Sequence, residues 1–263
     1  MENVKALFLD LDGTLLDVGI GKWAKISDNN KNAVLEFSQK GKVIISTGRS
    51  FNLEVKKIAQ TVNASFTVCQ NGSQIYDQNF NLIKDLKISY PLVNQVFEIV
   101  KEWKASFVAN SSIFIYGPFF WNKLFSLFSN FKAKKYKFFN AHDSNKILII
   151  HRNKTQVRKI HQKINEKFFN DLKAEIVGKN WAIEITEKNC TKGKAAEYIL
   201  DLLNINANNS IHIGDSMNDS STSGIVGKLI AMKSGSNKLK KIADEIGEKR
   251  KKAGVAKILK NLS

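Results

Sequence analysis

Residues 6–14 read ALFLDLDGT, an apolar run that leads directly into two carboxylates separated by one residue. A continuous apolar run such as Ala6–Leu9 is typical of a buried parallel strand, and ligands bind just beyond the carboxyl ends of such strands. Strand alternation predicts that the side chains of Asp10 and Asp12 lie on the same side, with Leu11 on the other. Two close carboxylates repel each other unless a cation, a shared proton or a ligand compensates them. Asp and Gly are also common in turns, so this stretch alone fits a turn equally well.

Three other segments place polar groups after an apolar run or at the start of a helix. The run at 42–46 ends in Thr47-Gly48-Arg49, and the run at 210–213 ends in Gly-Asp. Residues 190–194 read CTKGK and open a segment with helical apolar periodicity. Strand ends would thus bring carboxylates, a hydroxyl group and a lysine together. These are the groups that phosphoryl transfer requires as nucleophile, acid/base, magnesium ligands and partners of the phosphoryl oxygens.

The four segments resemble, in order, the four motifs of the haloacid dehalogenase superfamily of phosphohydrolases. Within it the chain is similar to the Cof-type phosphatases, which carry a large α/β cap. The matching segments are DLDGTL at 10–15, TGR at 47–49, KG at 192–193 and GDSMND at 214–219, with further Cof-like segments QNG at 70–72, IAMK at 230–233 and, more weakly, AGVA at 253–256. The matches span nearly the whole chain.

The order of expected elements predicts the fold class. Strands at 4–9, 43–46 and 66–69 alternate with helices at 28–39 and 51–62, which indicates an α/β protein with a Rossmann-like, doubly wound parallel sheet. This pattern is interrupted over 85–185 by mixed helices and strands, and it resumes with a helix at 192–204 and a strand at 210–214. We therefore expect a discontinuous catalytic core over 1–84 and 186–263. The resemblance implies that the α+β insert over 85–185 is a cap domain that selects the substrate.

The resemblance assigns roles to five residues of this chain. Asp10 is the expected nucleophile, since an ionised carboxylate needs no base to activate it. Asp12 is expected to protonate the leaving oxygen and then to deprotonate the attacking water. Thr47 and Lys192 would contact the phosphoryl oxygens. Mg²⁺, the expected cofactor, would be held by Asp215, by the carboxylate of Asp10 and by the main-chain carbonyl of Asp12.

A second group of residues is expected to support the site or the phosphate: Leu11, Gly48, Asn71, Asn218 and Asp219. Asn218 or Asp219 would act as a ligand or would hold the ligands in place, and an ordinary turn or helix cap is an equally good interpretation. Arg49 is expected to orient a loop. His212 lies inside an expected strand, so we interpret it as a packed core residue.

Composition limits the class of protein. The chain has 263 residues, of which 43% are apolar and 25% charged, as in ordinary globular domains. No apolar stretch approaches the roughly 20 residues of a membrane span, and no membrane partner is expected. The N-terminal residues lead directly into a strand without a signal peptide, which favours a cytoplasmic location. Cys69 and Cys190 have no spacing typical of a disulfide framework or a zinc site.

The formal net charge of +17 is large, and +9 of it falls in residues 85–185. Such a charge attracts anionic substrates and, in other proteins, nucleic acid. The basic residues form no recognisable nucleic-acid-binding motif, so we do not expect that partner. The aromatic residues Phe119, Phe120, Trp121, Phe125, Phe128 and Phe131 are expected in the core, with stacking on a sugar or base as the less favoured alternative.

The prediction for function is a Mg²⁺-dependent phosphatase, which hydrolyses small phosphorylated metabolites such as sugar phosphates through an aspartyl-phosphate. A phosphotransferase or mutase on the same fold is one alternative. A basic protein that retains the fold but binds nucleic acid is another. The identity of the substrate and the oligomeric state are not encoded in a readable motif.

Overall fold

The computed structural model describes residues 4–19, 21–110 and 112–262, and the chain divides into two compact units. Unit 1 combines residues 1–85 with 190–263, and unit 2 comprises residues 86–189. The divisions fall at 85/86 and 189/190, against 84/85 and 185/186 in the sequence prediction. The second differs most because the last strand of unit 2 continues to Glu187.

Unit 1 is built on an eight-stranded sheet with the order β14-β13-β12-β1-β2-β3-β4-β5. All neighbouring strands from β14 to β3 are parallel, and β4 and β5 are added antiparallel. The predicted α/β class with a parallel sheet is therefore confirmed. The strands are β1 (Ala6–Leu9), β2 (Lys42–Ser46), β3 (Phe66–Cys69), β4 (Gln74–Asp77), β5 (Leu82–Asp85), β12 (Ser210–Gly214), β13 (Lys228–Ala231) and β14 (Glu245–Ile246).

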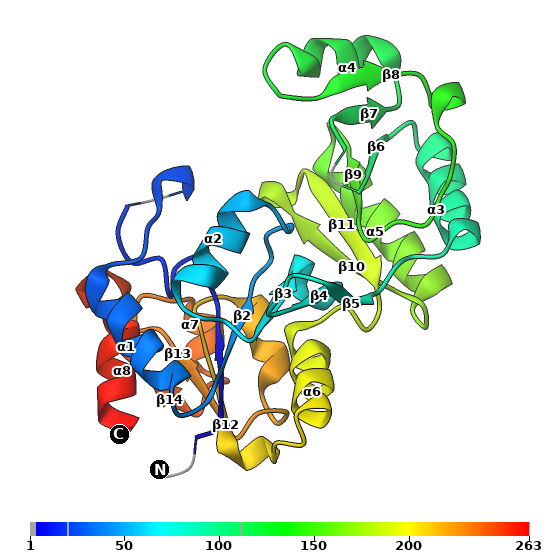
Figure 1. The fold of residues 1–263 in the computed structure, drawn as a ribbon. Helices are drawn as coiled ribbons and strands as arrows, with labels where there is room; N and C mark the ends of the chain where they lie inside the picture. Colours follow the sequence, from blue (N-terminus) through cyan, green and yellow to red (C-terminus); the bar gives the residue numbers. More distant parts are fainter. Residues whose placement is uncertain (1–3, 20, 111, 263) are drawn as a thin grey trace. The chain divides into compact units, whose positions relative to one another are not determined.

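Helices cover both faces of this sheet (Figure 1). On one face, Leu7 and Leu9 of β1 pack in a core with α1 (Asp28–Ser38), α2 (Leu53–Thr61) and α8 (Gly254–Leu262). On the other face, Ala6 and Phe8 pack in a core with α6 (Lys192–Leu202). The alternation of β1 thus supplies both cores, which explains why the strand reads as a continuous apolar run.

Short elements complete unit 1. They are α7 (Asn237–Lys240) and the 3-10 helices η1 (Gly21–Trp23), η2 (Gln70–Gly72), η5 (Ala207–Asn209), η6 (Met217–Thr222) and η7 (Arg250–Lys252). Strand β14 was not expected from the sequence. Both of its residues are exposed, so no apolar run marks it.

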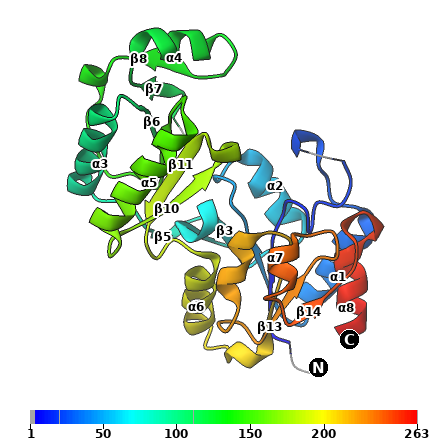
Figure 2. The ribbon, with the colours of Figure 1, turned by 180° about the vertical axis from the view of Figure 1, so that it is seen from behind.

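Unit 2 has a six-stranded sheet with the order β10-β11-β9-β6-β7-β8. Its helices α3 (Tyr90–Glu102) and α5 (Lys154–Phe168) share one apolar core with β6, β9 and β11 (Figure 2). The other elements are β6 (Ser106–Ala109), β7 (Phe114–Tyr116), α4 (Phe119–Ser126), β8 (Lys132–Lys134), η3 (Tyr136–Phe138), β9 (Ile147–Ile150), β10 (Leu172–Val177), η4 (Gly178–Asn180) and β11 (Ala182–Glu187). No helix among the described residues has the length and apolar character needed to cross a membrane.

The aromatic stretch around α4 differs from the sequence prediction. We expected its side chains in the core, but Phe120 is 74% exposed and Phe128 is 87% exposed. The interpretation was wrong because α4 packs on the short strands β7 and β8 through Asn122, the one residue of this helix that is buried. No second apolar layer covers its remaining side chains among the described residues of unit 2.

Asn30 fixes the loop after β1, and its loss should destabilise unit 1. Its Nδ2 donates to the carbonyl of Leu15 (3.3 Å) and its Oδ1 accepts from the N–H of Ala256 (3.0 Å). Asn30→Ala leaves both backbone groups unpaired in the interior, so we expect a loss of about 2–4 kcal/mol of unfolding free energy. Urea denaturation measures this. Asn32→Ala, at an exposed position of the same helix, is the control, and equal midpoints for the two variants would contradict the expectation.

Candidate active site

Three adjacent strands of unit 1 carry predicted site residues at their carboxyl ends. Asp215 follows β12, Asp10 follows β1 and Thr47 follows β2, and β1 lies between the other two. The N–H of Asp10 donates to the carbonyl of Ile213 (3.0 Å), so β1 and β12 remain paired up to the first carboxylate. Segments distant in the sequence therefore meet at one edge of the sheet, as parallel topology requires.

Lys192 lies at the centre of this site. Its Nζ is 2.6 Å from Oδ1 of Asp10 and 2.6 Å from Oδ1 of Asp219, and its side chain is fully buried. Burial disfavours the charged amine, but the two carboxylates outweigh it and raise the pKa of Lys192. Lys192 is therefore a buried cation held by two anions, which links α6 to β1 and η6.

Gly193 allows α6 to approach η6. Its N–H donates to Oγ of Ser221 (3.1 Å), and a Cβ at this position would overlap the carbonyl oxygen of Ser221. Only a residue without a side chain fits, so the glycine after Lys192 is a packing requirement that sets the position of the lysine.

Asp219 accepts four hydrogen bonds. Its Oδ1 accepts from Lys192 and from Nε2 of His212 (2.9 Å), and its Oδ2 accepts from the N–H groups of Asp215 (3.0 Å) and Ser216 (2.9 Å). Burial opposes its ionisation, but Lys192 and His212 outweigh this effect and hold the pKa of Asp219 below its usual range. Asp219 was expected either to support the site or to cap a turn. It does both, because it holds Lys192 and accepts from the N–H groups of Asp215 and Ser216.

His212 contributes a contact that the sequence did not reveal. It is buried in β12 beside Phe8, as expected of a core residue, but its Nε2 also bonds to Asp219. Burial lowers the pKa of His212, so the ring is neutral at pH 7 and donates Nε2–H to the carboxylate. Nothing in the strand pattern signals this bond, because η6 returns to the strand only in the folded chain.

Asp10 and Asp215 form an acidic pair beside Lys192. Burial, with help from the nearby carboxylates, raises the pKa of Asp10 to about 7 against the opposing effect of Lys192. Burial and the charge of Asp219 raise the pKa of Asp215 to about 6. Carboxylate oxygens of these three aspartates all lie within 4.8 Å of one another. One buried lysine among three carboxylates leaves a surplus of negative charge.

This donor set fits a divalent cation. Hard carboxylate oxygens are the ligands that Mg²⁺ prefers, and a cation would offset the burial and the repulsion that raise both pKa values. Because both oxygens of Asp219 already accept hydrogen bonds, Asp10 and Asp215 are the residues that would hold the ion.

The loop after β1 is shaped around Asp215. Gly13 has φ +84°, and a Cβ there would overlap the carboxylate of Asp215. A residue with a side chain is therefore excluded both by the backbone conformation and by the contact. The Asp-Gly pair of the first motif is needed for this close approach.

Asp12 is not part of the cluster formed by Asp10, Asp215 and Asp219, although its charge helps to raise the pKa of Asp215. β1 ends at Leu9 and a turn follows, so strand alternation does not extend to Asp12. Its side chain is 53% exposed and its two oxygens accept from Nε and a terminal nitrogen of Arg49, both at 2.7 Å. Arg49 also pairs with Glu54 at 2.9 Å. In this structure the carboxylate of Asp12 is bound to Arg49.

The other predicted residues form a network behind these groups. Thr47 is buried, its Oγ1 accepts from the N–H of Arg49 (3.1 Å), and its carbonyl accepts from the N–H of Asn71 (3.0 Å). Asn218 donates through Nδ2 to Oδ1 of Asn71 (2.9 Å). Gly48 lies against this Asn71 oxygen, and Leu11 is part of the core.

Comparison with known proteins places the chain in a family. The family described as haloacid dehalogenase-like hydrolase matches residues 7–259. The chain belongs to this family. A Mycoplasma pneumoniae protein named "Putative phosphatase" is 31% identical in an alignment that covers 94% of this chain and 93% of that protein. The resemblance inferred from the four motifs is thus confirmed, and the chain is an enzyme of the hydrolase class.

Two further matches extend over almost the whole haloacid dehalogenase-like chain. The Bacillus subtilis protein named 5-amino-6-(5-phospho-D-ribitylamino)uracil phosphatase YcsE is 25% identical in an alignment that covers 98% of this chain and 96% of that protein. A crystal structure from Thermotoga maritima has a TM-score of 0.79 at 21% identity and covers 98% of this chain and 97% of its own. The match to the Thermotoga maritima structure shows the fold.

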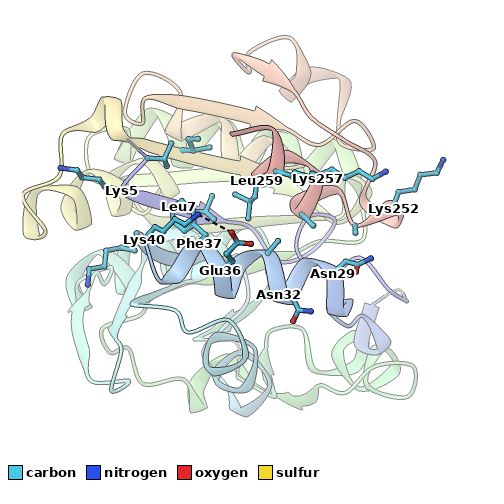
Figure 3. Close-up of a pocket in the computed structure, with 18 of the residues that line it drawn as sticks. Lys5, Leu7, Asn29, Asn32, Glu36, Phe37, Lys40, Lys252, Lys257 and Leu259 are labelled. Carbon is cyan, nitrogen blue, oxygen red and sulfur yellow. Dashed lines mark hydrogen bonds and ion pairs between the residues drawn. The ribbon is translucent and has the colours of Figure 1, made fainter. Parts of the chain in front are cut away.

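A separate hollow of about 1420 Å³ lies in unit 1 between α1 and α8 (Figure 3). Apolar residues such as Leu7 and Leu259 line it together with several lysines, and Lys40 pairs there with Glu36 at 3.5 Å. None of its described lining residues belongs to the predicted site. The lysines that line this hollow therefore lie outside the predicted site.

Gly193→Ala tests the close approach of α6 to η6. Alanine favours a helix by roughly 1 kcal/mol over glycine, but its Cβ would displace Ser221 and with it Lys192. We expect a net loss of about 1–3 kcal/mol of unfolding free energy. Urea denaturation measures it, with Lys194→Ala, exposed on the same helix, as control. A gain of stability in Gly193→Ala would show that the contact is unimportant.

The raised pKa of Asp215 predicts a pH-dependent effect in the absence of divalent cations. A folded pKa of about 6, above the ordinary value of 3.8, means that ionisation of Asp215 costs stability as pH rises through about 4 to 6. Asp215→Asn in EDTA should therefore melt at a higher temperature than the unsubstituted protein at about pH 8, with the gap shrinking toward about pH 4.

Adding Mg²⁺ at about pH 8 should raise the melting temperature of the unsubstituted protein and have little effect on Asp215→Asn. In the pH comparison, taking the difference in melting temperature between the two proteins removes the contribution of His212. The lowered pKa of His212 changes stability with pH in the opposite direction. The same change at exposed Asp201 of α6 is the control. Equal responses to Mg²⁺ in both proteins would rule out Asp215 as a ligand.

Proposed function

We propose that this chain is a Mg²⁺-dependent phosphatase that hydrolyses phosphate monoesters of small metabolites through an aspartyl-phosphate on Asp10. The observation that carries the proposal is the contact of Lys192 with both Asp10 and Asp219, next to Asp215. It joins the first, third and fourth motifs at one point. The names of the relatives from Mycoplasma pneumoniae and Bacillus subtilis support a phosphatase.

Asp10 is the nucleophile in this proposal. Lys192 binds its Oδ1, which leaves Oδ2 to attack phosphorus. The P–O bond to the leaving group breaks as the bond from Oδ2 to phosphorus forms, and water later attacks the same phosphorus to release phosphate and restore the carboxylate. Lys192 favours the ionised form of Asp10 against the burial that raises its pKa, since an ammonium at 2.6 Å stabilises the charged form.

Lys192 also has a donor left for the substrate. An ammonium has three N–H bonds, and Asp10 and Asp219 accept two of them. The third can stabilise a phosphoryl oxygen as negative charge develops there. A Mg²⁺ ion held by Asp10 and Asp215 would neutralise the repulsion between carboxylate and phosphate.

Asp12 supplies the proton in this proposal, and it must leave Arg49 to do so. The pairing of Arg49 with Glu54 makes this exchange feasible, because the guanidinium keeps one carboxylate partner when Asp12 turns away. Asp12 then protonates the leaving oxygen and afterwards takes a proton from the attacking water. Thr47 assists from β2, where its hydroxyl already orients the loop of Arg49.

The substrate class is a phosphorylated small molecule, and we assign its selection to unit 2. The Bacillus subtilis relative is named for a phosphorylated ribitylamino-uracil, which is a phosphate monoester of this size. The positive charge of residues 85–185 favours anionic substrates of any such kind.

Asp10→Asn should abolish hydrolysis. We expect the rate with a panel of phosphate monoesters and Mg²⁺ to fall by about a thousandfold or more, because an amide does not attack phosphorus. Release of inorganic phosphate measures it, and Asp201→Asn at an exposed position is the control. EDTA should abolish the activity of the unsubstituted protein. Hydrolysis by Asp10→Asn at the full rate would contradict the role of Asp10.

Hydroxylamine tests the covalent step. An acyl phosphate reacts with it to give a hydroxamate, so enzyme quenched during turnover should carry this modification on Asp10, as read by peptide mass spectrometry. Turnover without any modified aspartate would leave hydrolysis intact but exclude the aspartyl-phosphate.

A further inference from the structure

Unit 2 contains a hollow of about 930 Å³ whose described lining comes from unit 2 alone. We call it the unit 2 hollow. It lies at the ends of α3 and β9, beside α4 and the first turn of α5, with Trp181 before β11 completing it. The chain enters unit 2 at Leu86, ahead of α3, and leaves it beyond Glu187, the last residue of β11. The hollow therefore lies at the C-terminal end of α3 and the N-terminal end of β11, whereas the two connections are at the other ends of these elements.

Three buried polar atoms in the lining have no hydrogen-bond partner. They are Nε1 of Trp103, Nδ2 of Asn122 and Oε1 of Gln156. Only five such side-chain atoms occur among the described residues of the whole chain, so more than half belong to this one hollow. Unpaired buried polar atoms are costly and rare in folded proteins. These atoms have almost no accessible surface, so a ligand in the hollow reaches them only when the side chains that cover them shift.

Asn122 carries this argument furthest. It is 2% exposed, and its Oδ1 accepts from Oγ of Ser106, which also lines the hollow. A leucine would serve better than an asparagine if α4 only had to pack on the strands beneath it. A half-satisfied amide at the one buried position of the helix is therefore a recognition group.

The walls of the hollow are aromatic. Three of the four tryptophans of the chain line it, namely Trp103, Trp121 and Trp181, and α4 and its C-terminal turn add Phe125 and Phe128. Trp121, Trp181 and both phenylalanines are more than 40% exposed. Arg152 lies over the ring of Trp121, and Nζ of Lys154 lies 4.8 Å from the ring of Trp181. Flat aromatic walls bind planar rings by stacking.

The charge around the hollow is positive. The Arg152 guanidinium lies 4.4 Å from the ring of Trp121, and exposed Lys104 lines the same space. The acidic lining residue Glu102 is already paired with Lys163 at 2.9 Å. A negatively charged group would thus find cations here that have not been neutralised by a neighbouring carboxylate.

We propose that the unit 2 hollow binds a nucleotide. Its base stacks on the aromatic walls, and the base edge pairs with the two unpaired donors and the unpaired acceptor once the side chains that cover these atoms shift. A nucleobase offers acceptors and donors on one edge, whereas a simple aromatic acid offers no donor to Gln156. The phosphate lies near Arg152 and Lys104. The volume is within the range of roughly 300–1,000 Å³ typical of small-molecule sites, and none of the candidate active-site residues takes part.

Binding of the four common nucleoside 3′,5′-cyclic monophosphates tests the proposal. These probes are phosphodiesters, so a phosphate monoesterase site does not consume them. We expect saturable binding of at least one of them by calorimetry, with a change in tryptophan fluorescence, and at least about tenfold weaker binding of the matching uncharged nucleoside. Asp10→Asn should bind the probe as the unsubstituted protein does, which separates this site from the candidate active site.

Two variants examine the recognition groups. Arg152→Gln, at an exposed position, should weaken the cyclic nucleotide about tenfold and leave the nucleoside unchanged. Asn122→Leu should weaken both by a similar factor. Lys123→Gln removes a charge from an exposed position of α4 outside the lining and should bind normally. If Asn122→Leu fails to fold, Arg152→Gln still tests whether the hollow binds the nucleotide.

Three results would overturn the proposal. The first is the absence of saturable binding for all four probes up to about 1 mM. The second is binding that neither variant weakens. The third is a dimer in sedimentation that Phe128→Ser dissociates, because a second copy of the chain would then cover the aromatic walls.

Discussion

One ammonium group between two buried carboxylates holds the candidate active site together. Lys192 joins Asp10 and Asp219 at 2.6 Å each, and these three residues come from α6, the end of β1 and η6. Removal of one partner from a buried ion pair leaves an uncompensated charge, which typically costs about 3–5 kcal/mol. Gly193 and Gly13 follow from this arrangement, since each permits a close approach that a side chain would block.

The same crowding gives the site its chemical character. Burial, reinforced by the neighbouring carboxylates, raises the pKa values of Asp10 and Asp215, while Asp219 is held ionised by its four donors. An acidic pair with raised pKa values is unfavourable for folding but well suited to a divalent cation. Functional sites commonly depart in this way from what stability alone would favour.

Much of the fold and of the site could be predicted because the signals are local. The apolar runs gave the central parallel strands, and the residues after them lie together because parallel strands end at one edge. Other features depend on contacts that no local pattern encodes. His212 meets Asp219 only when η6 returns to β12, Asp12 turns to Arg49 because β1 ends at Leu9, and the aromatic residues of α4 stay exposed because nothing in unit 2 covers them.

The amino-acid sequence by itself determined the family, the α/β class and the segments that supply the charged groups, because residue type and spacing are enough to specify strand ends and motifs. Tertiary structure decided which carboxylates share the lysine, which one is bound to an arginine and where unpaired polar atoms gather around a hollow. The reason is physical: pKa values, ion pairs and burial depend on distances between residues far apart in the chain, and only the folded packing sets those distances.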